Sequence, residues 1–331
     1  MVNYPYLCTQ IQNKYKDYVN WTRKTAKAFA FFVGDKLEDG EAALAHYEKI
    51  YNTRRDVYGV EDADTLVALS NLAATYGENG DYPTAIKLYE ELYELRSKLL
   101  GEGHPDTLSL LGDMGFAYSK LEDYAKAAEL YGREYRGYSE LYGEEDDKTI
   151  QALASYATLL TRDGRYEEAI PYLERLYAVR VRLLGEEHTA TMTACNNLAC
   201  TYADVDDIPK ALEYFEKNYA ARCHAQGEEH PQTLISLNNI AWAYWQLGDI
   251  DRAHELYEKV YTLRLRTLGE EHASTLFSLN KLATVTAERG DKAGAMLLYM
   301  QEYELRVKYY GPDDEKARAA ADAIAELAGA E

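Results

Sequence analysis

The hydrophobic and polar positions of this chain recur with a period of 42 residues. Four residue types mark the period, and each keeps its place in every repeat. Threonine recurs at Thr65, Thr107, Thr149, Thr191, Thr233 and Thr275. In the same frame follow Ala43, Ala85, Ala127, Ala169, Ala211, Ala253 and Ala295; Gly59, Gly101, Gly143, Gly185, Gly227, Gly269 and Gly311; and Tyr51, Tyr93, Tyr135, Tyr177, Tyr219, Tyr261 and Tyr303. Such self-similarity at a fixed interval indicates a repeat architecture.

Two apolar stripes within one period predict two helices. The stripes are Leu69, Leu72, Ala73 and Tyr76 in the first helix, and Ala85, Leu88, Tyr89, Leu92 and Tyr93 in the second. Their members are spaced three or four residues apart, as on one face of a helix. The pair cannot bury its apolar face alone, so we expect successive pairs to stack. Alanine at the position of Ala85 in every repeat would let two helix backbones approach closely where they cross.

Local signals predict where these helices begin and end. Thr65 or Asp64 can cap the N-terminus of the first helix. Gly80-Asp81 breaks the chain after it, and Pro83 suits the first turn of the second helix because its φ is preset. Gly101 suits the residue just past the end of the second helix. The sequence therefore predicts an all-α fold.

One repeat carries a pattern that resembles a known family. The pattern consists of Asn238-Asn239-Ile240-Ala241, Tyr244, Gly248-Asp249, Ala253, Tyr257-Glu258, Arg264 and Leu268-Gly269-Glu270-Glu271-His272. It is similar to the 42-residue tetratricopeptide repeat of kinesin light chains and related array proteins, over roughly residues 22–330. The resemblance implies a right-handed superhelical solenoid of antiparallel helix pairs. Two features depart from the family: tyrosine replaces leucine at the position of Tyr93, and Pro171 inside a second helix predicts a local kink.

The regular repeats do not cover the whole chain. We expect six 42-residue repeats over 64–315, an N-terminal capping helix with a degenerate repeat over 1–63, and a C-terminal capping helix over 316–331. Residues 8–36 have helical spacing and are predicted to be helical. Terminal repeats of such arrays are atypical because they cap the stack. Two alternatives stay open: the protein ends on the capping helix, or this array is part of a longer protein.

Composition and charge narrow the possible partners. The chain has 36 Lys and Arg against 56 Asp and Glu, for a net charge of −20. This balance argues against nucleic acid and anionic membranes as ligands and weakly favours basic partners. No apolar run is long enough to span a membrane, and no signal peptide is visible. Because Cys8, Cys195, Cys200 and Cys223 lack disulfide-framework spacing, we expect reduced thiols in a cytoplasmic protein.

No motif in the sequence points to catalysis. A nucleophile–base set, a metal-ligand constellation and a phosphate-binding loop are all missing. We therefore predict that the protein is not an enzyme and needs neither a cofactor nor a structural metal. Histidines recur just before the first helices and are interpreted as loop and capping residues; they are His104, His188, His230 and His272.

Arginine recurs near the end of the second helices, with two possible meanings. The members are Arg54, Arg96, Arg180, Arg222, Arg264 and Arg306, with Tyr138 in the one interrupted position. They could form a basic recognition stripe. We favour a structural role, because a guanidinium near a helix C-terminus offsets the helix dipole and can pair with carboxylates of adjacent repeats.

The polar face of the first helices is the candidate binding surface, because the resemblance implies that this face lines a concave groove. Asn71, Asn197 and Asn239 match the family's peptide-backbone clamp, in which a side-chain amide both donates and accepts as a peptide unit does. Other residues occupy this position in three repeats, so the clamp should be strongest in the C-terminal half. The candidate peptide-binding residues are Asn71, Asn196, Asn197, Asn238, Asn239, Trp242, Trp245, Asn280 and Lys281. The alternative is that these asparagines only solvate an exposed helix face.

Trp242 and Trp245 are the most distinctive feature of that surface. They lie three residues apart on the stripe that continues from Ile235 and Asn238. Exposed indoles are costly without a role, and tryptophan is a preferred anchor in recognition surfaces. The alternative is that both rings pack against the neighbouring first helices.

These observations favour a cytoplasmic scaffold or adaptor that binds an extended peptide segment in its groove. The expected partner is a protein or peptide that is basic or carries an apolar anchor, and the oligomeric state is left open. One alternative is a sensor or regulatory arm of a larger effector enzyme. Another is a self-associating structural array, in which the tryptophans meet a second copy.

Overall fold

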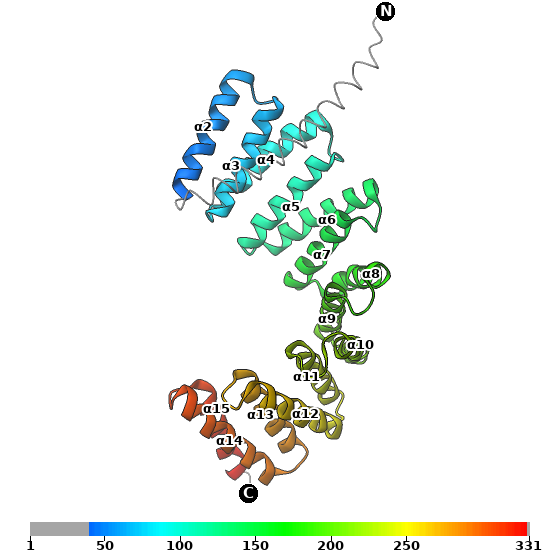
Figure 1. Ribbon diagram of the computed structural model, residues 1–331, viewed down its shortest axis with the longest axis vertical. Helices are drawn as coiled ribbons and strands as arrows, with labels where there is room; N and C mark the ends of the chain where they lie inside the picture. Colours follow the sequence, from blue (N-terminus) through cyan, green and yellow to red (C-terminus); the bar gives the residue numbers. More distant parts are fainter. Residues whose placement is uncertain (1–39, 330–331) are drawn as a thin grey trace, which may run out of the picture. The chain divides into compact units, whose positions relative to one another are not determined.

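The computed structural model describes residues 40–329, and in this range the chain forms fourteen α-helices and no strand. The predicted helix over residues 8–36 lies outside the described residues. The described part of the chain divides into two compact units, one ending at Leu141 and the other beginning at Tyr142. Within each unit, consecutive helices run side by side in alternating directions (Figure 1). The all-α prediction is therefore confirmed.

The first unit contains five of the described helices. They are α2 (Gly40–Tyr58), α3 (Ala63–Glu78), α4 (Tyr82–Leu100), α5 (Pro105–Lys120) and α6 (Tyr124–Tyr142), whose last residue falls just past the unit boundary. Helix α2 packs on α3, α3 on α4, and α4 on α5. The first helix of each pair has 16 residues and the second has 19.

The second unit continues the same alternation. Its helices are α7 (Asp147–Arg162), α8 (Tyr166–Leu184), α9 (Thr189–Asp204), α10 (Ile208–Gln226), α11 (Pro231–Gln246), α12 (Ile250–Leu268), α13 (Ala273–Glu288), α14 (Lys292–Tyr310) and α15 (Glu315–Gly329). Each helix packs on the next one in the chain. Helix α8 runs unbroken through Pro171. The odd-numbered helices of this unit are first helices, and α8, α10, α12 and α14 are second helices.

The alanines that recur every 42 residues, which we call the alanine ladder, lie in the core. Six of its members are fully buried, namely Ala85, Ala127, Ala169, Ala211, Ala253 and Ala295. Ala253 of α12 belongs to one cluster with Ala241 of α11 and Leu282 of α13. Helix α12 thus buries its small residue against first helices on both sides. Successive pairs complete each other's core, as the stacking argument expects.

Helix α3 is capped two or three residues earlier than the sequence suggested. Asp62, and not Thr65 or Asp64, caps α3, and its side chain accepts a hydrogen bond from the Thr65 N–H at 3.1 Å. Thr65 is fully buried, because the helix begins at Ala63 and the third helical position faces inward. The histidine interpretation is confirmed, because His104, His188, His230 and His272 cap α5, α9, α11 and α13 through Nδ1 at 3.1–3.2 Å.

The turn between the helices of a pair needs a left-handed residue. Gly80, Gly164 and Gly248 occupy it with φ of 75–84°, which glycine adopts without strain. In two repeats a residue with a side chain stands there instead, Glu122 with φ 61° and Asp206 with φ 62°. For a residue with a Cβ this conformation costs roughly 1–2 kcal/mol, and the cost is smaller for aspartate than for most residues.

We expect Glu122→Gly to raise the free energy of unfolding by about 1 kcal/mol, because it removes this strain. The gain for Asp206→Gly should be smaller. Midpoints of urea denaturation, followed by helical circular dichroism, measure both effects. Glu186→Gly is the matched control, since Glu186 is exposed and has no positive φ; it should be slightly destabilising. A lower midpoint for Glu122→Gly would contradict the account.

Candidate peptide-binding surface

Two predicted clamp residues, Asn197 and Asn239, lie on successive first helices, and one of them is hydrogen-bonded to a third asparagine. Asn239 of α11 is half-buried and donates from Nδ2 to Oδ1 of Asn196 on α9 at 3.4 Å. Asn197 follows on α9 and is exposed. The structure therefore brings Asn196 and Asn239 together and leaves the Asn197 amide open to solvent. The bond between them is long for an N–H···O hydrogen bond, whose usual length is ~2.9–3.0 Å.

The other predicted asparagines have different surroundings. Asn71 lies on α3 in the first unit and is half-buried. Asn238 is half-buried on α11, and its Oδ1 is buried without a hydrogen-bond partner among the described residues. Asn280 donates from Nδ2 to Oε2 of Glu302 on α14 at 2.9 Å, and Glu302 is fully buried. The Asn280 amide is thus engaged inside the α13/α14 pair, unlike that of Asn197.

Neither tryptophan of the predicted anchor is fully exposed. Trp242 and Trp245 are half-buried and pack against the core cluster formed by α11, α12 and α13. The Trp245 Nε1–H donates to Oε2 of Glu288 on α13 at 2.6 Å. The premise of two exposed indoles was therefore wrong. A bulky ring at either position has a neighbouring first helix to pack on, as the alternative interpretation supposed.

Helix α13 adds a feature that sequence reasoning missed. The Lys281 Nζ lies 5.4 Å from the centroid of the Trp245 ring and 5.6 Å from that of Phe277. Phe277 is 41% exposed. An ammonium between two aromatic faces is held by cation–π attraction. The i, i+4 spacing of Phe277 and Lys281 was a signal for one half of this contact. We call Trp245, Phe277 and Lys281 the aromatic cluster.

The arginines that recur near the ends of the second helices, which we call the arginine ladder, have a mostly structural role. The Nη1 atoms of Arg96, Arg180 and Arg264 donate to the carbonyl ten residues further along, at 3.0–3.1 Å. Each bond ties the end of a second helix to the start of the next first helix. Arg54 instead pairs with the Asp64 carboxylate at 2.7 Å. The structural interpretation is confirmed for these members, although three of them use a backbone carbonyl and not a carboxylate.

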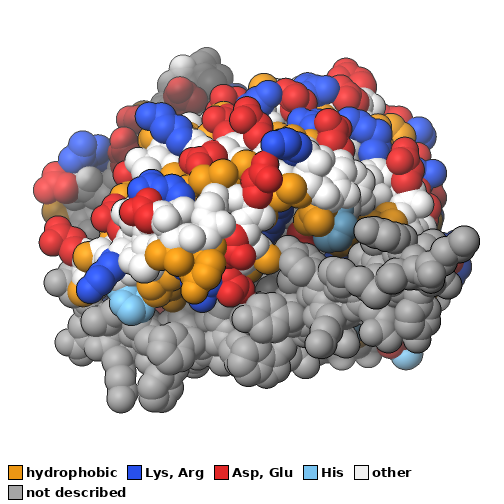
Figure 2. All heavy atoms as spheres, turned by 90° about the horizontal axis from the view of Figure 1, so that it is seen from above, with side chains coloured by type: hydrophobic (Ala, Val, Ile, Leu, Met, Phe, Trp, Pro, Cys, Tyr) orange, Lys and Arg blue, Asp and Glu red, His pale blue; other side chains and the backbone are white. Residues whose placement is uncertain are grey.

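Acidic side chains in the loops between repeats form ion pairs with neighbouring Lys and Arg side chains. Lys259 meets Glu228 at 2.5 Å, Arg182 meets Glu145 at 2.6 Å, and Lys308 meets Glu270 at 3.0 Å. Such exposed pairs contribute little to stability, because water and salt screen them. Figure 2 shows one face of the molecule, on which acidic and basic side chains are interspersed over the described surface. Despite the net charge of −20, the described part of this face therefore carries no acidic patch without neighbouring basic side chains.

Two of the three cysteines in the described part of the chain, Cys195 and Cys200, are thiols whose pKa is raised by burial. Burial raises the pKa of the Cys195 thiol to about 11, and its Sγ donates to the Tyr214 carbonyl oxygen at 3.3 Å. Burial also raises the pKa of Cys200. Within residues 40–329 no three His, Cys, Asp or Glu side chains are placed to hold a metal ion. Cys8 lies outside this range.

None of the helices within residues 40–329 is long and apolar enough to cross a membrane.

The structure defines an array of antiparallel helix pairs whose first helices carry amide side chains. The family model for the tetratricopeptide repeat matches residues 36–96, 64–140, 148–223 and 205–266. Because these matches span more than half of the sequence, the chain belongs to the tetratricopeptide repeat family.

Solved structures give the same fold. A Podosopora anserina protein with nearly identical TPR-like repeats, provisionally designated a kinesin light chain, is 26% identical with a TM-score of 0.56; the match covers 62% of this chain and 97% of that one. BtubC (BKLC) from P. vanneervenii is 22% identical, with a TM-score of 0.52 and coverage of 70% and 93%. The C-terminal part of a TPR protein from Cytophaga hutchinsonii is 15% identical, with a TM-score of 0.57 and coverage of 85% and 97%. No curated protein matches the chain.

Proposed function

We propose that this protein is a cytoplasmic scaffold that binds an extended segment of a partner protein along the first helices α9, α11 and α13. Tetratricopeptide repeats generally mediate protein–protein interaction, typically as non-enzymatic scaffolds. The observation that carries the finer proposal is the row of amides on adjacent first helices. Asn197 is exposed, and Asn239 reaches Asn196 of the neighbouring repeat.

The chemistry of this row suits a peptide backbone. A side-chain amide offers one acceptor and two donor hydrogens, and an extended peptide presents alternating N–H and C=O groups. Packed helices lie ~8–10 Å apart, close to the length of three residues of extended chain at ~3.3 Å each. The bond between Asn239 and Asn196 is 3.4 Å long, so a peptide amide can replace it at little cost.

The aromatic cluster supplies an apolar contact beside the amide row. Phe277 keeps much of its surface exposed, and Lys281 holds its charge against the Phe277 and Trp245 rings. An apolar side chain of the segment could rest on these rings, which are large and rigid. We propose that Trp242, which packs against the core cluster, supports these two rings from below.

Selection from a library of random peptides tests the proposal, because no partner needs to be known. Each of Asn197→Ala and Asn239→Ala should weaken a selected peptide by about 1 kcal/mol, or roughly fivefold in Kd, the worth of one amide hydrogen bond. Isothermal titration calorimetry measures the change. Glu258→Ala is the control, since Glu258 is exposed on the second helix α12; it should leave Kd unchanged. Peptides that bind tightly and tolerate both asparagine changes would contradict the proposal.

A further inference from the structure

A polar hollow lies among α9, α10 and α11 of the second unit. Its volume is about 150 Å³, well above the roughly 10–15 Å³ that holds one water. It is lined by Thr193 and Asn196 of α9, Arg222 of α10, and Gln232, Ile235 and Ser236 of α11. Thr193, Gln232 and Ile235 are exposed and form the mouth, whereas Arg222 and Ser236 are buried and form the floor.

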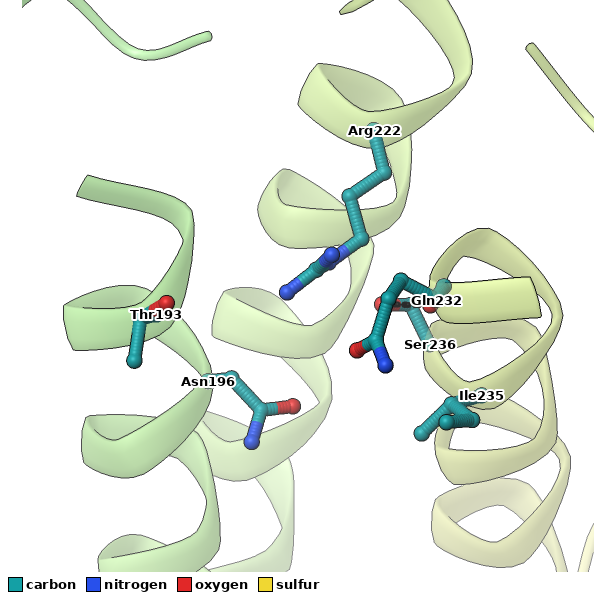
Figure 3. A pocket seen from close by; sticks show the side chains of 6 residues that line it. All are labelled: Thr193, Asn196, Arg222, Gln232, Ile235 and Ser236. Atoms are coloured by element: carbon teal, nitrogen blue, oxygen red, sulfur yellow. Dashed lines mark hydrogen bonds between the residues drawn. The ribbon is translucent and has the colours of Figure 1, made fainter. Parts of the chain in front are cut away.

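Arg222 is the one charged residue of this lining, and its side chain points into the hollow. Figure 3 shows the guanidinium directed into the space between Asn196 on one side and Gln232 and Ser236 on the other. Arg222 is only 7% exposed, and its Nε is buried without a hydrogen-bond partner among residues 40–329. Burial also lowers the pKa of the Arg222 guanidinium. The side chain stays charged because arginine titrates far above neutral pH.

Its ladder counterparts are all partnered. Arg180 and Arg264, at the same position of the neighbouring repeats, donate to the carbonyls of Ala190 and Ser274. The equivalent carbonyl for Arg222 belongs to Gln232, and no hydrogen bond joins these two residues in the described structure. A buried guanidinium N–H without a partner, such as the Arg222 Nε–H, is unfavourable. Arg222 therefore differs from a ladder member that merely ties two helices together.

Helix α14 shows what is missing beside Arg222. There the buried Arg306 Nε donates to Glu302 four residues before it, at 2.7 Å, and Glu302 is fully buried. The equivalent pair on α10 is Asn218 and Arg222, so a neutral amide stands where α14 has a carboxylate. The Asn218 Nδ2 donates to Ser236 Oγ at 3.2 Å. The α10 site thus keeps the buried guanidinium and lacks the negative charge.

We propose that this hollow binds one carboxylate, the side chain of an aspartate or glutamate in the bound segment, with Arg222 as its counter-charge. The inference rests on the proposed function, because Asn197 and Asn239 lie on the two helices that flank the hollow. A single cation matches a charge of −1 better than the charge of about −2 on a phosphate group. Arginine is also the preferred partner of carboxylates, since its fork matches their two oxygens.

The proposal is compatible with the acidity of the chain. A net charge of −20 disfavours a partner segment that is acidic throughout. It does not prevent one carboxylate from entering a site with its own buried cation, because nearby interactions are screened less than distant ones. We therefore expect a segment with a single acidic residue at a fixed position, among apolar or basic neighbours.

Nuclear magnetic resonance of arginine side chains tests the site directly. The probe is N-acetylglutamate α-amide, which carries one free carboxylate, and N-acetylglutamine amide is its neutral control. The Nε–Hε resonance of Arg222 should shift in a saturable way with the carboxylate and stay in place with the amide. The Arg180 resonance should stay in place with both. No response of Arg222 to the carboxylate, or equal responses to both probes, would overturn the proposal.

Asn218→Glu is the sharpest variant, because it builds into α10 the carboxylate that α14 already has. The Arg222 resonance of this variant should no longer respond to N-acetylglutamate α-amide, while its melting temperature stays at or above that of the unchanged protein. An undiminished response would overturn the proposal. If Asn218→Glu does not fold, the peptide measurement below, which uses Arg222→Gln, still tests the proposal, since losing an unpaired buried charge should not destabilise the fold.

Selected peptides separate this inference from the proposed function. Replacing the one essential Glu of a bound peptide by Gln should weaken binding to the unchanged protein about tenfold or more, the worth of a hydrogen bond to a charged group. The same replacement should have no effect on Arg222→Gln. Peptides that bind along the first helices without needing an acidic side chain, or that need only their C-terminal carboxylate, would overturn the inference and leave the scaffold standing. A shifted Arg222 resonance without any bound peptide would instead leave the carboxylate site and remove the scaffold.

Discussion

Ala169→Arg should lower the free energy of unfolding by at least about 3 kcal/mol. Ala169 is 0% exposed on α8 and holds the ladder position at which second helices cross their neighbours. A long side chain there overpacks the crossing, which costs ~1–3 kcal/mol, and it also takes a charge into an apolar interior. The effect should therefore exceed that of any surface substitution in the same helix.

Ala178→Arg is the matched control for this prediction. Ala178 lies nine residues further along α8 and is exposed, so the same chemical change meets water there. Its free energy of unfolding, obtained from urea denaturation, should stay within about 0.5 kcal/mol of that of the unchanged protein, as is usual for surface substitutions. Equal midpoints for Ala169→Arg and Ala178→Arg would show that the alanine ladder does not mark the helix crossings.

The double change of Trp242 and Trp245 to alanine should weaken a selected peptide by roughly 30-fold or more. Aromatic anchors in binding surfaces cost ~2 kcal/mol or more when truncated, and each 1.4 kcal/mol is tenfold in Kd. In this protein the loss has two sources. The direct contact with Trp245 is lost, and so is the support that the two rings give to the aromatic cluster.

Packing and binding must be separated in this experiment, because both rings are half-buried. Tyr261→Ala is the matched control, since Tyr261 is a half-buried aromatic residue that packs against the same core cluster from the second helix α12. It should lower stability yet leave Kd unchanged at a temperature where both variants are folded. A peptide whose Kd is the same for the double variant and the unchanged protein would remove the tryptophans from the binding surface.

Much of the fold could be predicted from the sequence because the period is regular. Gly101 ends α4 with φ 90°, and Pro83 lies in the first turn of that helix, as the local signals indicated. The capping residue of α3 was misplaced, because Asp62, Asp64 and Thr65 all suit an N-cap. Only the structure shows that Thr65 faces inward. Its burial depends on the neighbouring helix, which a local pattern does not contain.

The candidate site was less predictable, because hydrogen bonding between repeats decides it. The sequence placed Asn197, Asn239 and Asn280 on first helices, but their partners follow from contacts across the helix pair. Asn280 is engaged by Glu302, whose position in an apolar stripe was the available signal. The isolation of Arg222 had a similar signal, the neutral Asn218 four residues earlier. Both signals become visible only when the repeats are compared with one another in space.

The side-chain amide resonances of Asn197 and Asn239 test the central claim most directly. In ¹⁵N-labelled protein, a peptide selected for binding should move both Nδ2 resonances and saturate them at the same concentration. Resonances of exposed residues on the second helices, such as the backbone amide of Glu258, should stay in place. If the peptide binds while both asparagine amides are unchanged and second-helix resonances move, the binding surface lies elsewhere and the account is wrong.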